Sequence, residues 1–118
     1  MIVGVGIDII EISRIENAIK KRKIFKNRVF TFAEQEYCLA ISCSYERFAG
    51  RFAAKEAVGK ALGSSLSWLD VEILTTKSGK PEVTLYNTAA ELAAGKHVHV
   101  SISHCRDYAV ASAIVEAY

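Results

Sequence analysis

Apolar residues follow two different periods along the chain, and the period changes at turn sequences. Alternating or continuous runs of β-branched and apolar residues indicate strands, because side chains on a strand point to opposite faces in turn. The sequence KSGKP between two such runs indicates a hairpin. Strands are predicted at 2–10, 71–76, 82–86, 97–103 and 108–115.

The segments between these strands carry helix start and stop signals. A serine or threonine followed three residues later by glutamate is a capping box, which opens a helix by satisfying free backbone N–H groups. Helices with such a box are predicted from Ser13 to about Lys23, from Thr31 to about Ile41 and from Thr88 to Gly95. A longer helix is predicted over 45–62, with Gly63 as its C-terminal stop.

Together these elements predict an α+β fold, in which one antiparallel sheet has helices packed on one side and one helix is long and central. The sequence has 118 residues and no linker, repeat or low-complexity tract, so we expect one domain over residues 1–118. Apolar residues make up 51% of the chain, which is rich for a small domain and suggests that another subunit covers part of its surface.

The cysteines and the N-terminal residues indicate the cellular compartment in which the protein works. Cys38, Cys43 and Cys105 are odd in number and lack CxxC spacing, as expected for reduced thiols packed as small hydrophobic side chains. The N-terminal stretch has no basic start and Asp8 interrupts its apolar run, so it does not resemble a signal peptide. No apolar run has the length of a membrane span. We expect a soluble, cytoplasmic protein without a membrane partner.

The net charge of +2 conceals one basic cluster. The stretch KKRKIFKNR, residues 20–28, contains six basic residues and no acidic one. Such a patch indicates either an acidic partner, which can be nucleic acid, an anionic membrane or an acidic protein, or an ordinary solvated helix end.

Two charged positions stand where the pattern predicts burial. Asp8 lies inside an apolar strand, where a carboxylate needs a partner or must point outward. On the long helix, Glu56 and Lys60 share a face among many alanines, so they form either a surface ion pair or the lining of a crevice. Mg²⁺ usually takes one or two carboxylates from a protein, and a nearby lysine would stabilise phosphate charge.

The histidines give a less specific signal. His104 falls where a strand ends in a turn, so it is either a solvent-accessible group that can contact an anion or move a proton, or a turn residue without a role. His97 and His99 share one strand face, but no third ligand is placed nearby in the sequence, which argues against zinc. The sequence has no P-loop, no GxSxG and no GxGxxG after its first strand.

Four blocks of the sequence resemble the holo-acyl-carrier-protein synthases, the short bacterial type of 4′-phosphopantetheinyl transferase. The blocks are GIDIIEISRIE (6–16), RVFTFAEQEYC (28–38), RFAAKEAVGKALG (51–63) and SISHCRDYAVASA (101–113). The likeness spans nearly the whole chain in the expected order. It implies an enzyme of fatty acid biosynthesis, which transfers 4′-phosphopantetheine from coenzyme A to a serine of apo-acyl carrier protein and releases adenosine 3′,5′-bisphosphate.

The resemblance implies a role for each charged residue of the site. Asp8 and Glu56 would bind Mg²⁺, and Lys60 would contact the coenzyme A phosphates. Larger members of the superfamily have a second acidic residue where this chain has Ile10, so we expect water to complete the metal shell. The general base is either Glu56 or a metal-bound water. Phosphoryl transfer of this kind depends mainly on positioning and charge stabilisation.

The resemblance also implies binding surfaces and an assembly. The residues expected to bind coenzyme A are Arg51, Lys60, Gly63 and His104, with Arg51 and His104 at the nucleotide end. The residues expected to dock the acidic acyl carrier protein are Arg14, Lys21 and Arg28, through attraction that weakens with salt. Short members of this family are homotrimers with active sites shared between adjacent subunits, and we expect the same here.

Two other functions are compatible with parts of the sequence. A nucleic-acid-binding module would use KKRKIFKNR, but the patch has no interleaved aromatic residue beyond Phe25, so we expect no nucleic-acid partner. Another Mg²⁺-dependent transferase acting on a nucleotide substrate would keep Asp8, Glu56 and Lys60 and dispense with the carrier-protein surface.

Overall fold

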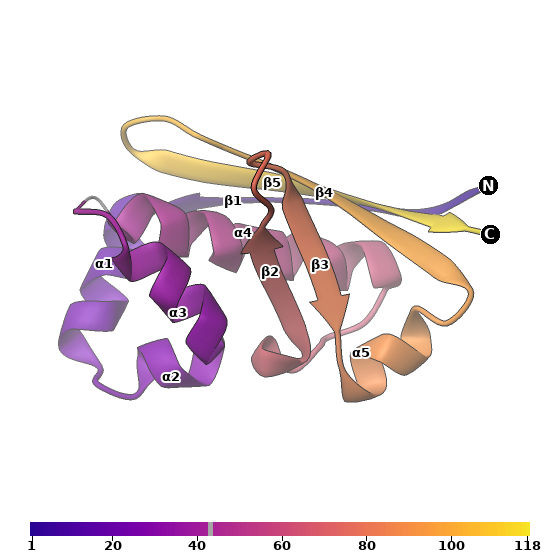
Figure 1. Ribbon diagram of the computed structural model, residues 1–118, viewed down its shortest axis with the longest axis horizontal. Coiled ribbons are helices and arrows are strands. Elements are labelled where there is room, and N and C mark those ends of the chain that lie inside the picture. Colours follow the sequence, from indigo (N-terminus) through magenta and orange to yellow (C-terminus); the bar gives the residue numbers. More distant parts are fainter. Residues whose placement is uncertain (43) are drawn as a thin grey trace.

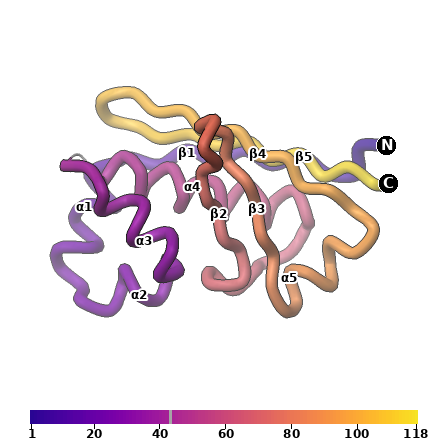
Figure 2. The backbone as a smooth tube through the Cα atoms, viewed as in Figure 1, coloured from indigo at the N-terminus to yellow at the C-terminus, as the bar shows by residue number. Residues whose placement is uncertain are grey.

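A three-stranded antiparallel sheet forms one layer of the computed structural model, which describes residues 1–42 and 44–118 (Figure 1). Its strands are β1 (Ile2–Glu11), β4 (Lys96–His104) and β5 (Tyr108–Ala117), in the order β1-β5-β4. The first strand pairs with the last one, so the two ends of the chain lie side by side (Figure 2). The expectation of a packed thiol at Cys43 falls outside the described residues.

The long helix α4 (Ser44–Leu62) covers one face of this sheet, and small residues let the two come very close (Figure 1). A Cβ atom added to Gly4 would lie 1.9 Å from the carbonyl oxygen of Ala61, and one added to Gly6 would lie 2.0 Å from that of Ala57. Only glycine therefore fits at these two positions of β1. This approach of backbone to backbone brings the residues that follow Gly6 directly against α4.

Three short helices pack at the N-terminal half of α4. They are α1 (Ile12–Lys21), α2 (Phe25–Val29) and α3 (Phe32–Leu39). Phe30, between α2 and α3, and Phe48, on α4, are both 1% exposed. Their rings pack edge to face with centroids 4.9 Å apart. This cluster is the aromatic part of a core whose remainder, under the sheet, consists largely of alanine.

The remaining strands, β2 (Val71–Thr75) and β3 (Pro81–Leu85), form a separate two-stranded sheet. The α+β class and the long central helix are confirmed, but the prediction that all strands form one sheet is wrong. The hairpin stays separate from the larger sheet because β2 packs against α3 and α4, where it buries Val71 and Ile73. A short 3₁₀ turn, η1 (Trp68–Asp70), precedes the hairpin, and α5 (Asn87–Leu92) follows it.

The capping predictions are confirmed at one of three helices. At α3, Thr31 Oγ1 accepts from the N–H of Glu34 at 3.2 Å, and Glu34 Oε1 accepts from the N–H of Thr31 at 2.8 Å. At α1 the prediction is wrong, because the helix begins at Ile12 with no side-chain cap. It is also wrong at α5, which begins at Asn87 without one. The helix α2 and the turn η1 were not predicted.

The other face of β1 is apolar and uncovered in the single chain. Val3, Val5, Ile7 and Ile9 alternate with the inward residues of the strand and are 48%, 66%, 63% and 63% exposed. Four large aliphatic side chains in a row form an exposed apolar stripe of the kind found at protein–protein contacts. Within the described part of the chain, no helix combines the length and the apolar character that crossing a membrane requires.

Candidate functional site

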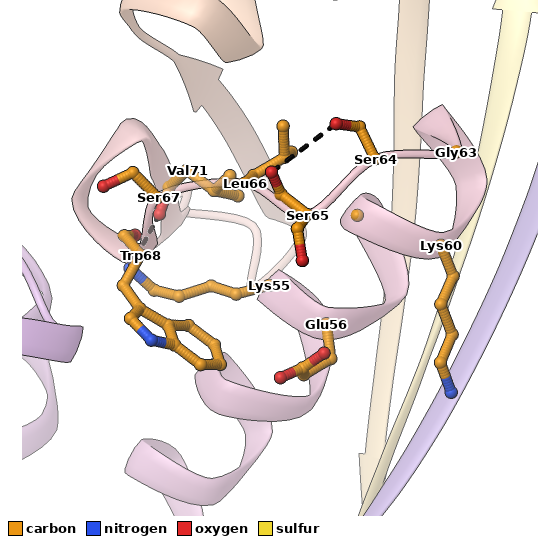
Figure 3. A pocket seen from close by; sticks show the side chains of 11 residues that line it. Lys55, Glu56, Lys60, Gly63, Ser64, Ser65, Leu66, Ser67, Trp68 and Val71 are labelled. Carbon is orange, nitrogen blue, oxygen red and sulfur yellow. Dashed lines mark hydrogen bonds between the residues drawn. The ribbon is translucent and has the colours of Figure 1, made fainter.

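Asp8 meets Lys60 where β1 lies against α4. The carboxylate belongs to the inward face of β1, and its side chain is 18% exposed. Lys60 Nζ lies 3.3 Å from Asp8 Oδ1 and donates to the carbonyl of Ile7 at 3.0 Å. In Figure 3 the Lys60 side chain extends toward β1. Asp8 therefore has the partner that a carboxylate in an apolar strand requires.

Glu56 lies one helical turn before Lys60 and is half-buried. Burial raises the pKa of its carboxyl above the ordinary value, and the negative charge of Asp8 raises that pKa further, while Lys60 opposes both effects. Two carboxylates from different elements thus act on each other across the contact between strand and helix. This pair of oxygen ligands beside an open cavity fits a hard divalent cation such as Mg²⁺, which takes few protein ligands.

A cavity of about 440 Å³ opens next to this pair (Figure 3). Its walls are the C-terminal half of α4 and the loop that follows the helix. The lining residues are Lys55, Glu56, Gly59, Lys60, Gly63, residues 64–68 and Val71. Gly63 has a φ of +74°, a conformation that favours glycine, and it turns the chain so that the loop forms the second wall. The structure therefore brings together three predicted residues, Glu56, Lys60 and Gly63.

Arg51 belongs to a different face of α4 and is buried, with 5% exposure. Its guanidinium donates to Thr75 Oγ1 and lies over the ring of Tyr37, 4.3 Å from the centroid. Arg47 lies over the same ring at 4.1 Å. Among the described residues, the buried Nε of Arg51 has no hydrogen-bond partner. This arginine therefore combines a structural contact with an unused donor.

His104 ends β4 and is exposed, as predicted from the break in the strand pattern. Its Nδ1 lies 3.6 Å from Glu46 Oε2, in the first turn of α4. Glu46 and Glu56 are roughly 15 Å apart along the helix, at 1.5 Å per residue. Within one chain, His104 therefore lies at the opposite end of α4 from the Asp8–Glu56 pair.

A second cavity, of about 350 Å³, lies along α1. Its basic residues are Arg14, Lys21 and Arg22, and its other lining residues are Ile10, Ile15, Asn17, Ala18, Phe25 and Phe52. We call this the α1 groove. The structure thus places Arg14 and Lys21 on one groove, whereas Arg28 is exposed on α2 and does not line it.

Sequence reasoning did not assign several residues that line these cavities. The loop 64–68 looked only like a turn, and its place opposite Glu56 depends on Gly63. Phe25 and Phe52, to which the sequence assigned no site role, line the α1 groove. Lys55 stands beside Glu56 in the sequence and was given no role, because its partner is distant in the chain.

Comparison with known proteins identifies the family. The model of the 4′-phosphopantetheinyl transferase superfamily matches residues 4–113. A holo-[acyl-carrier-protein] synthase of Protochlamydia amoebophila is 51% identical over 119 residues, covering 97% of this chain and 98% of the relative. One from Moorella thermoacetica is also 51% identical, over 95% of this chain and 92% of the relative.

Solved structures show the same fold. A holo-(acyl-carrier-protein) synthase from Bacillus anthracis, solved in complex with CoA (3′,5′-ADP), superposes with a TM-score of 0.85 at 40% identity, covering 100% of this chain and 99% of that one. The Helicobacter pylori enzyme in complex with coenzyme A has a TM-score of 0.85 at 32% identity, covering 95% and 99%.

An α+β fold with two carboxylates and a lysine at the edge of a cavity has the groups that an enzyme of phosphoryl transfer requires. The chain belongs to the 4′-phosphopantetheinyl transferase superfamily, and within it to the holo-[acyl-carrier-protein] synthases.

Proposed function

We propose that this enzyme transfers the 4′-phosphopantetheine group of coenzyme A to a serine of apo-acyl carrier protein, for fatty acid biosynthesis. The products are holo-acyl carrier protein and adenosine 3′,5′-bisphosphate. The observation that carries the proposal is a cavity lined by Glu56 and Lys60, with Asp8 3.3 Å from Lys60 Nζ and close enough to Glu56 to raise its pKa. We place this reaction in the cytoplasm, where the thiols of Cys38 and Cys105 stay reduced.

Asp8 and Glu56 are the residues that would hold Mg²⁺. Their support is chemical: both are carboxylates, they come from different elements, and their charges influence each other. Mg²⁺ at this place would supply charge neutralisation for the pyrophosphate of coenzyme A. In this proposal water would complete the metal shell, since Ile10 stands where larger members of the superfamily have a second acidic residue after the first Asp.

The side chains of the chain itself would position and deprotonate the reactants. The serine oxygen forms a bond to the phosphorus next to pantetheine, and the bond from that phosphorus to the bridging oxygen breaks. The bridging oxygen leaves with adenosine 3′,5′-bisphosphate. Lys60, whose side chain is 54% exposed, can turn from Asp8 to the phosphate oxygens and stabilise their charge. Glu56 takes the serine proton in this scheme, because it is the carboxylate among the residues that line the cavity.

The α1 groove is the proposed docking surface for acyl carrier protein. It combines the cations Arg14 and Lys21 with the rings of Phe25 and Phe52. Cations attract an acidic partner over distance, and apolar rings contribute contact area once it has docked. Arg28, exposed on the neighbouring α2, extends the basic surface beyond the groove.

Arg51 and His104 are proposed to bind the nucleotide end of coenzyme A, together with Lys60 and Gly63 nearer the phosphates. Because His104 lies far along α4 from Glu56, one chain does not bring these groups to one cavity. We propose a homotrimer in which the Asp8 half of one subunit faces the His104 half of the next. The apolar stripe of Val3, Val5, Ile7 and Ile9 supports this assembly, because it offers an uncovered surface to a second copy.

Intact-protein mass spectrometry tests the reaction directly. Apo-acyl carrier protein incubated with the enzyme, coenzyme A and Mg²⁺ should gain the mass of one phosphopantetheine. EDTA should prevent the gain, and added Mg²⁺ should restore it. No gain with carrier proteins of several kinds would overturn the proposed reaction, and a gain that persists in EDTA would overturn the metal requirement.

A further inference from the structure

A buried ion pair lies directly behind the cavity. Lys55 Nζ is 2.8 Å from Glu34 Oε1, and the two side chains are 1% and 0% exposed. Lys55 belongs to α4 and Glu34 to α3. Breaking such a pair by removing one partner leaves a buried charge without compensation, so the pair is a fixed feature of the fold.

Every N–H of the Lys55 ammonium has an acceptor. Besides Glu34, it donates to the carbonyl of Trp68 at 2.8 Å and to that of Val71 at 2.7 Å. An ammonium has three donors, so none is left for a ligand. Lys60 differs, because its side chain is 54% exposed and its contacts are to the carboxylate of Asp8 and to one backbone carbonyl. The two lysines that line the cavity therefore have different tasks.

Glu34 fixes the pair from its other side. Its Oε1 accepts from the backbone N–H of Thr31 at 2.8 Å, and its Oε2 accepts from that of Ile73 at 2.7 Å. Lys55 and Glu34 together thus contact the backbone of α3, of η1 and of β2. A network in which each member is satisfied is rigid, and it determines where the chain between these elements lies.

Trp68 is held by two contacts, one through its backbone and one through its side chain. Its carbonyl accepts from Lys55, and its indole stacks on the ring of Phe52 with centroids 4.9 Å apart. The residues before it, 64–67, form the wall of the cavity opposite Glu56. Figure 3 shows Lys55 extending toward Trp68, whereas Lys60 extends away from it toward β1. The position of this wall therefore depends on a lysine whose three donors are all engaged within the protein.

We propose that Lys55 is a positioning residue: anchored by Glu34, it holds the carbonyls of Trp68 and Val71 and so sets the wall 64–68 against which coenzyme A binds. This inference rests on the proposed function, because it takes coenzyme A as the ligand of the cavity. Lys60 remains the lysine that contacts phosphate. Loss of the Lys55 contacts should weaken coenzyme A binding and leave the chemical step nearly intact, since no reacting atom loses a contact.

Trp68 makes the test specific, because it is the one tryptophan of the sequence. The variant to compare with the wild type is the double substitution Glu34→Gln and Lys55→Met, which removes both buried charges together and keeps the side-chain sizes. Its Trp68 emission should shift to longer wavelength before any ligand is added. The dissociation constant for coenzyme A should rise about tenfold, while kcat at saturating substrate changes by less than about threefold.

The matched control is the exposed pair of the same residue types, Glu16 and Lys20, which are 2.7 Å apart on α1. Glu16→Gln with Lys20→Met should leave both the Trp68 emission and coenzyme A binding unchanged. The proposal is overturned if the Glu34/Lys55 variant folds and keeps wild-type emission and affinity. It is also overturned if kcat falls by about 100-fold at unchanged affinity, which would place Lys55 at the reacting atoms.

A second measurement uses the unmodified protein and does not depend on the folding of a variant. Hydrogen exchange of the amides in 64–71 should slow when coenzyme A is bound, because the wall lies against the ligand. Unchanged exchange in this segment at saturating coenzyme A would overturn the proposal. A wild type that neither binds coenzyme A nor modifies a carrier protein would instead refute the proposed function.

Discussion

Glu56 on α4 and Asp8 on β1 are close enough for the charge of one to raise the pKa of the other. The raised pKa of Glu56 determines the sign of its contribution to stability. A carboxyl whose pKa is raised in the folded protein binds its proton more tightly there than in the unfolded chain. Its contribution to stability is therefore favourable at low pH and is lost as the pH rises through the raised pKa. Near neutral pH, the ionised Glu56 opposes folding in the absence of metal.

Substitution of Glu56 should consequently separate stability from activity. Glu56→Gln keeps the shape of the side chain and removes the charge, so we expect a melting temperature in EDTA at pH 7.5 that equals or exceeds that of the wild type. The advantage should shrink toward pH 4. Transfer of phosphopantetheine should fall by about 100-fold or more, since the proposed metal ligand and the proposed proton acceptor are lost together. A folded variant with full Mg²⁺-dependent activity would refute the assignment of Glu56.

The close contact between β1 and α4 predicts that replacing Gly6 destabilises the fold more than replacing a glycine within α4. Gly6→Ala would place a Cβ 2.0 Å from the backbone oxygen of Ala57, so strand or helix must move. We expect a loss of about 1–3 kcal/mol in the free energy of unfolding, measured in urea. Gly50→Ala is the matched control, because its Cβ would meet a side-chain methyl, Cγ2 of Ile102 at 2.9 Å, and not a backbone atom. Its effect should stay within about 1 kcal/mol. Equal losses in both variants would contradict the close approach of β1 and α4.

The α1 groove predicts different effects for neighbouring cations. Arg14→Gln and Lys21→Gln should each raise the KM for acyl carrier protein about two- to fivefold at low salt, because an exposed charge pair contributes up to about 1 kcal/mol. The KM for coenzyme A should not change. Lys20→Gln is the control, since Lys20 pairs with Glu16 and does not line the groove. If Lys20→Gln has the largest effect, the groove is not the docking surface.

The apolar stripe predicts the assembly. Val5→Glu adds a charge to the outer face of β1. Native mass spectrometry should therefore show a single chain for this variant and the proposed trimer for the wild type. Activity should fall with it, although Asp8, Glu56 and Lys60 are unchanged. Leu39→Glu on α3 is the control, because Leu39 is similarly exposed, at 54% against 66%, and lies away from this stripe. A Val5→Glu protein that remains trimeric would exclude the stripe as the subunit contact.

The sequence correctly predicted those features that depend on contacts between residues close together in the chain. The box of Thr31 and Glu34 is confirmed because each side chain meets a backbone group within the same turn. Gly63 ends α4 because its positive φ is accessible to glycine. The sequence pointed to Asp8, Glu56 and Lys60 because a charged side chain inside an apolar segment needs a partner or solvent. The periodicity of strand and helix then predicts which side of the element each of them faces.

Contacts between distant segments explain the errors. The box at Ser13 fails because α1 continues directly from β1, and the N–H of Ile12 is satisfied by the carbonyl of Asp107 at 2.9 Å. That partner is remote in the sequence, so no local pattern predicts it. Lys55 was left without a role for the same reason, because its acceptors come from α3, η1 and β2. The division of the strands into two sheets likewise depends on how β2 packs against α3 and α4.

The pairing of β1 with β5 places a constraint on the order of events during synthesis. Within sheet β1-β5-β4, the strand that carries Asp8 has one neighbour, and Asp8 itself lies opposite Ala111. A growing polypeptide therefore cannot place Asp8 in this sheet until the ribosome has released β5, which contains Ala111. Contacts of such long sequence separation form late and slowly. A nascent or shortened polypeptide that lacks β5 would already contain Glu56 and Lys60 but would have no sheet to carry Asp8, and so it would remain inactive.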